Sequence, residues 1–178
     1  NKSGLMIITA VVALAASVFA STVTINAYSG YRSGSGGEFN ITSNDALLNP
    51  STLGYNPVAI VSGGFETFCL EYNQHFTPGS TYNFGISGAA IGSSGADNIS
   101  IATAWLYSQF ARNAWDAAYF SGANVYSYVA GAARSASAAA LQNTIWWLEN
   151  ENYSSGTSPN PGNIFSTAVL AKFSNLVG

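Results

Sequence analysis

The spacing of apolar residues changes once along the chain, and this change limits the folds that the chain can adopt. In the first half, residues 22–28, 38–42 and 81–86 alternate apolar and polar side chains, which predicts strands with one exposed face. From Asn98 onward, apolar residues recur at three- and four-residue steps, which predicts helices. Strands followed by helices indicate an α+β fold, in which N-terminal antiparallel strands, arranged as a sandwich or barrel, pack against a C-terminal helical part.

Glycine, serine and proline divide the first half of the chain into segments. Residues 29–37 are rich in glycine and serine, which predicts a long loop, so the strands at 22–28 and 38–42 should form a hairpin across it. Residues 45–57 contain prolines and predict irregular structure, and residues 58–61 predict a short buried strand.

The segment at residues 65–72 carries apolar side chains on both faces, which predicts a central strand covered on each side. We expect it to pair with residues 81–86 as a hairpin, and we expect residues 87–97 to form a loop of small residues. Alternation places Thr67, Cys69 and Glu71 on one face of this strand and Phe68, Leu70 and Tyr72 on the other.

Three helices are predicted in the second half of the chain. Asp97 or Ser100 is available as N-cap of the first, which should bury Trp105 and Leu106. Residues 113–131 are rich in aromatic side chains, and their pattern leaves their secondary structure open. The predicted helices are residues 99–112, a segment from near Ser135 or Ser137 to at most Asn152, and a segment from Asn160 and Pro161 to about residue 176.

The first 20 residues have the pattern of a secretory signal peptide. Lys2 precedes an apolar run at residues 5–19, and Val18 and Ala20 provide the small-residue pattern for cleavage before Ser21. The apolar run is shorter than the ~20 residues of a membrane-spanning helix, so we expect no membrane insertion of the mature chain. Residues 21–178 should then form one secreted or cell-surface domain. Gly178 follows an apolar helical pattern, and we expect further sequence beyond it.

The low charge of the chain excludes several classes of partner. Charged residues make up 7% of the sequence, with five lysine and arginine residues against eight acidic ones, and no basic run occurs. Nucleic acids and anionic membranes are bound by clustered basic side chains, so neither is an expected partner. No cluster of histidine, cysteine or carboxylate residues is apparent, so we expect no metal site and no cofactor.

Cys69, the only cysteine, is the main candidate for chemistry. A lone cysteine in an exported chain is a buried thiol, an intermolecular disulfide, or a reactive group. His75, the only histidine, lies six positions further on, so a hydrolase with a Cys69–His75 dyad is one alternative, although no motif for an oxyanion hole accompanies it.

Three segments resemble known exported proteins. They are the Phe-Cys-Leu-Glu motif at residues 68–71, the predicted helix at 99–110, and the Leu-Gln-Asn-Thr-Ile-Trp motif at 141–146. These residues resemble the thioester domains of bacterial surface adhesins, and also exported biofilm-matrix proteins that carry a C-terminal Pro-Glu-Pro sorting signal. The resemblance covers residues 65–151. Leu141 stands where the adhesin domains usually have threonine, and no Pro-Glu-Pro signal is present.

The resemblance implies an internal thioester between Cys69 and Gln142. Such a domain would be an extracellular adhesion or matrix protein rather than an enzyme, and it would bond covalently to a protein amine or a polysaccharide hydroxyl. Its Cys69 sulfur should lie within contact reach of the Gln142 amide. Under this interpretation Phe68, Trp146 and Trp147 would exclude water from the bond, and Glu71, His75 or Glu149 would accept the thiol proton.

A second hypothesis is a non-covalent matrix or glycan-binding structural protein that uses its tyrosine and tryptophan side chains. Cys69 would then be a buried thiol. The cysteine hydrolase is the third hypothesis. The mass of the intact mature protein distinguishes them, because formation of a thioester releases one ammonia.

Overall fold

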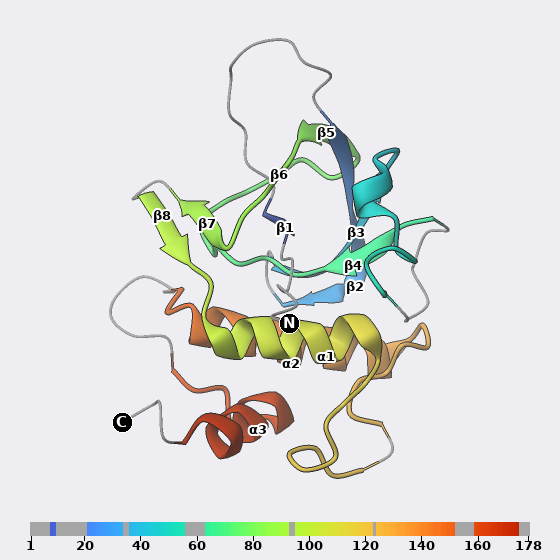
Figure 1. The fold of residues 1–178 in the computed structure, drawn as a ribbon. Helices are drawn as coiled ribbons and strands as arrows, with labels where there is room; N and C mark the ends of the chain where they lie inside the picture. Colours follow the sequence, from blue (N-terminus) through green and yellow to red (C-terminus); the bar gives the residue numbers. More distant parts are fainter. Residues whose placement is uncertain are drawn as a thin grey trace.

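The strands of the first half of the chain and the helices of the second half occupy separate layers (Figure 1). The computed structural model describes residues 8–9, 21–33, 36–55, 63–92, 95–122, 124–151 and 159–174. In Figure 1 the strands lie above a layer formed by α1 (Ile101–Arg112) and α2 (Ala132–Leu148), and α3 (Ile164–Phe173) lies below that layer. The predicted α+β class is confirmed.

The main sheet has four antiparallel strands in the order β4-β3-β2-β5. Its centre is the hairpin of β2 (Thr22–Ser33) and β3 (Gly36–Ser43), in which Ile25 is paired with Ile41. The predicted loop at residues 29–37 is wrong, because β2 continues through most of it and pairs again with the start of β3 after an irregularity between Ala27 and Arg32. The glycines at the start of β3 are strand residues, and Gly36 and Gly37 are buried.

The predicted central strand at residues 65–72 is also wrong. Only β4 (Phe65–Thr67) is extended, and it pairs with β3 at one edge of the sheet. The expected hairpin partner, β5 (Ser80–Asn83), pairs instead with β2 at the opposite edge, where Tyr82 lies opposite Val23. The alternation of faces therefore ends at Thr67, and residues 68–79 cross from one edge of the sheet to the other without forming a strand.

Two small strand pairs accompany the sheet. β7 (Ala89–Gly92) and β8 (Gly95–Asn98) form an antiparallel pair where a loop at 87–97 was predicted, because the ladder is made by main-chain groups that small residues also carry. β6 (Gly85–Ile86) pairs with β1 (Ile8–Thr9), and apart from β1 the predicted signal peptide lies outside the described residues. The predicted strand at 58–61 also lies outside them. Among the described residues, no helix has the length and apolar character needed to span a membrane.

The helices begin and end at recognisable caps. The Ser100 side chain accepts a hydrogen bond from the Thr103 N–H at 3.1 Å and starts α1, which confirms one of the two predicted caps. α2 starts after Gly131, a few residues before the predicted position. α3 is capped by Asn163 rather than Asn160, since the Asn163 side chain accepts from both the Phe165 and Ser166 N–H groups, and α3 ends at Phe173.

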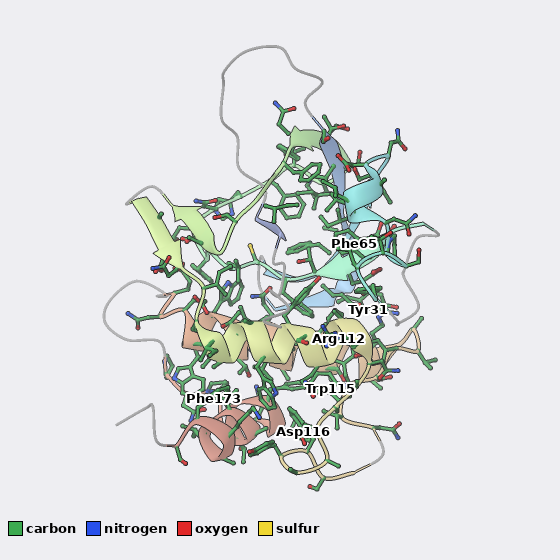
Figure 2. The ribbon with its side chains drawn as sticks, in the orientation of Figure 1. Tyr31, Phe65, Arg112, Trp115, Asp116 and Phe173 are labelled. Atoms are coloured by element: carbon green, nitrogen blue, oxygen red, sulfur yellow. The ribbon has the colours of Figure 1, made fainter. Side chains whose placement is uncertain are left out.

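Apolar side chains form two clusters on opposite faces of the main sheet. Phe39 and Ile41 point from β3 into the smaller cluster together with Val23 and Ile25 of β2. The larger cluster fills the space among the three helices, where aromatic rings dominate, and Figure 2 shows Trp115 and Phe173 in its lower part. Its fully buried members include Leu106, Phe110, Ala138, Leu141, Ile145, Phe165 and Val169.

Candidate functional site

The side-chain amide of Gln142 lies directly against the main chain of Cys69. Gln142 Nε2 donates to the Cys69 carbonyl oxygen at 2.8 Å, and the Cys69 N–H donates to Gln142 Oε1 at 3.0 Å. Gln142 has no exposed surface. The structure therefore brings together the two residues that the sequence pattern paired, although they lie 73 positions apart.

A second backbone N–H reaches the same oxygen. The Gly37 N–H, at the start of β3, donates to Gln142 Oε1 at 2.9 Å. Two backbone donors thus converge on one carbonyl oxygen from different segments of the chain. Two donors satisfy both lone pairs of a buried amide oxygen, and the same donors would stabilise negative charge on it if a nucleophile added to the carbonyl carbon.

The packing of α2 on β3 explains how Gln142 reaches this position. Arg134, Ala138, Gln142 and Trp146 recur at four-residue steps and form one stripe along α2. Gly36 faces this stripe, and a Cβ atom at Gly36 would lie 2.1 Å from Trp146 Cζ2 and 3.0 Å from Gln142 Cδ. Only glycine permits this approach, so Gly36 allows the helix to seat its amide on the strand.

The thiol of Cys69 is mostly shielded from solvent. Its Sγ donates to the Glu71 carbonyl oxygen at 3.2 Å. Burial raises the pKa of the Cys69 thiol to about 11, and the negative charges of Glu71 and Glu151 add to this increase. The thiol is consequently protonated at neutral pH, and nucleophilic attack requires removal of its proton.

Three carboxylates gather near the thiol, although no such cluster was apparent in the sequence. Glu71, Asp97 and Glu151 each place an oxygen within 4.8 Å of the others. Partial burial raises the pKa of Glu71, and the neighbouring carboxylates, Glu151 first, raise it further. Glu151 also accepts the Tyr72 N–H at 2.8 Å, which ties the segment after Cys69 to the end of α2. The group therefore sets a negative potential around Cys69.

The aromatic residues proposed to exclude water lie in different places. Trp146 is 1% exposed, and its ring meets the Tyr72 ring edge-on with centroids 4.9 Å apart, so this pair covers the amide. Phe68 instead packs against Phe110 at 5.0 Å in the larger cluster, and Trp147 contacts the same cluster. Phe68 and Trp147 are thus core residues rather than walls of the site.

The proposed proton acceptors are also separated. His75 is exposed, and the described contacts include no hydrogen bond between it and Cys69, whose thiol is directed to Glu71. Glu149 accepts the Ser100 N–H at 3.2 Å and supports the start of α1. Glu71 is the candidate that the structure leaves beside the thiol.

The sequence interpretation missed Gly36 and Gly37, which were assigned to a loop. Two adjacent glycines immediately before an alternating apolar segment can signal a close approach of backbone to another element, but they signal a turn equally well. Comparison of the chain with protein-family models, with curated proteins and with solved structures finds no match.

Proposed function

We propose that this chain is an extracellular adhesion or matrix protein in which Cys69 and Gln142 form an internal thioester. The observation that supports the proposal is the position of the Gln142 amide. Its oxygen accepts two backbone N–H groups, and its nitrogen donates to the carbonyl of the residue that bears the thiol. Two donors would satisfy any buried amide oxygen, so the support comes from the identity of the partners: the amide is held against the main chain of the only cysteine in the sequence.

The bond forms in two steps. Cys69 Sγ loses its proton and attacks Gln142 Cδ, and the negative charge that develops on Oε1 is stabilised by the N–H groups of Gly37 and Cys69. The C–N bond then breaks, and Nε2 takes up the proton released by the thiol and leaves as ammonia. Glu71 is placed to relay this proton, because its charge acts on the thiol and its raised pKa makes its carboxylate a stronger base than that of an ordinary glutamate.

A target nucleophile would open the thioester. A primary amine attacks Cδ to form an amide, or a hydroxyl forms an ester, and Cys69 recovers its thiol. The same two donors serve this second attack, since the charge again develops on Oε1. The targets are protein amines or polysaccharide hydroxyls outside the cell, and this localisation rests on the signal-peptide pattern at residues 1–20.

The mass of the intact purified protein tests the proposal. A thioester leaves the protein lighter by one ammonia, and incubation with methylamine should then add one methylamine. Cys69→Ala and Gln142→Ala should each abolish capture. Gln142→Glu is the matched control, because it retains an oxygen for both N–H donors but has no ammonia to release. A protein of full mass that captures no methylamine, even after mild heating, would contradict the proposal.

A non-covalent matrix or glycan-binding protein is the second candidate. The observation that favours it is the raised pKa of Cys69, which suits an inert buried thiol. Full mass together with a thiol that resists alkylation in the folded protein would support this candidate. Full mass with a rapidly alkylated thiol would favour a hydrolase instead.

A further inference from the structure

We infer that the buried ion pair between Glu38 and Arg134 positions α2 on β3, and thereby places the Gln142 carbonyl on its two N–H donors. Glu38 and Arg134 are positioning residues, because neither touches the reacting atoms. The effect of this positioning on bond formation rests on the proposed thioester, whereas the positioning of α2 on β3 does not depend on that proposal.

The ion pair is almost completely removed from solvent. The side chains of Arg134 and Glu38 are 4% and 0% exposed. Arg134 Nε donates to both carboxylate oxygens of Glu38, at 3.2 and 3.0 Å, and Nη2 donates to Oε1. This bidentate geometry fixes the relative orientation of the guanidinium and carboxylate groups as well as their distance.

Neighbouring groups complete the network around this pair. The Tyr126 hydroxyl donates to Glu38 Oε2 at 2.8 Å, and Arg134 Nη1 donates to the Tyr128 carbonyl oxygen at 2.7 Å. The guanidinium also lies 5.3 Å from the ring centroid of Tyr31, which Figure 2 shows beside the helical layer. The two charges are therefore held by contacts from β2, β3 and the segment before α2.

The ion pair and the candidate site connect the same two elements. Glu38 follows Gly37 directly in β3, and it lies on the same face of the strand as Gly36, two positions earlier. Arg134 and Gln142 lie on the same stripe of α2, about 12 Å apart along the helix axis. The ion pair joins α2 to β3 at Glu38, next to the Gly37 donor. The hydrogen bond from the Gly37 N–H joins the same two elements at Gln142 Oε1. A shift of α2 along β3 would therefore disturb both contacts.

A fully buried ion pair is a poor source of stability, because the loss of hydration offsets the attraction between the charges. In some proteins a buried polar or ionic group selects one packing arrangement, and this is the role that we assign to the pair here. The Trp146 ring packs on Gly36 by van der Waals contact, which restrains sliding less than a bidentate ion pair does. Register is therefore the property that the pair should control.

Hydrogen exchange in a Cys69→Ala background tests this inference, since residue 69 keeps its N–H and no thioester can form. The test variant adds Glu38→Leu, Arg134→Met and Tyr126→Phe, which remove the ion pair without leaving a buried charge. We expect protection of the Gly37 and residue-69 N–H groups to fall at least tenfold, while the N–H groups of α1 keep theirs. Lys172→Met is the matched control, because it removes a half-exposed ion pair with Asp116 at 3.9 Å that does not touch β3.

Unchanged protection at Gly37 and residue 69 would overturn the inference. Equal loss of protection at these positions and in α1 would also overturn it, because the pair would then act only on global stability. If the triple replacement does not fold, Arg134→Lys provides the same comparison, since lysine keeps the charge but lacks the planar fork. In the protein that retains Cys69, isolated in denaturant before it has ever folded, we expect ammonia release during its first folding to slow at least tenfold. Absence of ammonia release in the parent protein would count against the proposed function, whereas the exchange result would still decide the positioning.

Discussion

Gly36→Ala is the most informative single substitution, because it adds one methyl group between the strand and the helix that carry the site. The new Cβ would lie 2.1 and 2.3 Å from two atoms of the Trp146 ring, whereas carbon atoms in contact are about 3.5 Å apart or more. Trp146 would have to move by about 1.4 Å to restore a normal contact. The ring is 1% exposed and packed against Tyr72, so it has no free space to enter.

Two effects should follow from this displacement. Overpacking of this kind costs about 1–3 kcal/mol of unfolding free energy, and we expect a value near the upper end, about 3 kcal/mol. A movement of α2 by about 1 Å would also stretch the Gly37 N–H bond to Oε1 from 2.9 Å beyond hydrogen-bond distance. Loss of one oxyanion donor should slow ammonia release by about 10²- to 10³-fold.

Denaturant unfolding measures the first effect. The intact mass over time measures the second, in protein that is isolated in denaturant and then folded for the first time, because a thioester that has already formed has no ammonia left to release. Gly88→Ala is the control, because a Cβ there meets nothing within 4 Å and its φ lies outside the left-handed region. Adding Trp146→Leu to Gly36→Ala should recover part of the lost stability, since the two side chains compete for one space. A Gly36→Ala protein with unchanged stability and unchanged ammonia release would refute the reasoning.

Three further predictions concern the thiol and the amide. Because burial and nearby charge raise the pKa of Cys69 to about 11, the thiolate fraction and the initial rate of ammonia release should increase about tenfold per pH unit between pH 7 and 10, and a plateau near pH 8 would contradict this. Glu71→Gln removes one of those charges, so the thiol pKa measured by alkylation kinetics should decrease; an unchanged value would mean that Glu71 does not contribute and would leave burial and Glu151 as the causes. Gln142→Ala leaves the N–H groups of Gly37 and Cys69 and the Cys69 carbonyl without their hydrogen-bond partner. Denaturant unfolding should show that the unfolding free energy falls by about 3 kcal/mol or more, against about 1 kcal/mol for Cys69→Ala. Equal losses would mean that these hydrogen bonds do not stabilise the fold.

The sequence predicted the α+β class and the helices well, because both depend on periodic patterns within one segment. Ser100 and the apolar spacing of α1 are signals within one segment, and the structure agrees with the helix that they predict. Strand partners were predicted in part: the hairpin of residues 22–28 with 38–42 is confirmed, whereas the expected pairing of 65–72 with 81–86 is wrong. Pairing of β5 with β2 rather than with β4 depends on contacts between segments more than 50 positions apart, which no local pattern encodes.

Some residues of the candidate site could likewise be predicted from the sequence, and others could not. Cys69 stands out as the only cysteine, and Gln142 was named because its motif resembles that of thioester domains. Gly37 contributes only its backbone N–H, which every residue except proline possesses, so nothing in its side chain could reveal the role. Glu38 and Arg134 were likewise indistinguishable from solvent-exposed charges until the fold placed them opposite each other.

The 73 positions between Cys69 and Gln142 have a consequence for the newly made chain. At synthesis rates of about 5–20 residues per second, the thiol exists for roughly 4–15 s before its partner has been added. During this interval the thiol is neither buried nor protected by α2, so its pKa is that of an ordinary cysteine. The sequence has no other cysteine, so a disulfide formed in this interval could only join Cys69 to a thiol of another molecule. One such event would remove the nucleophile before the site had ever been assembled.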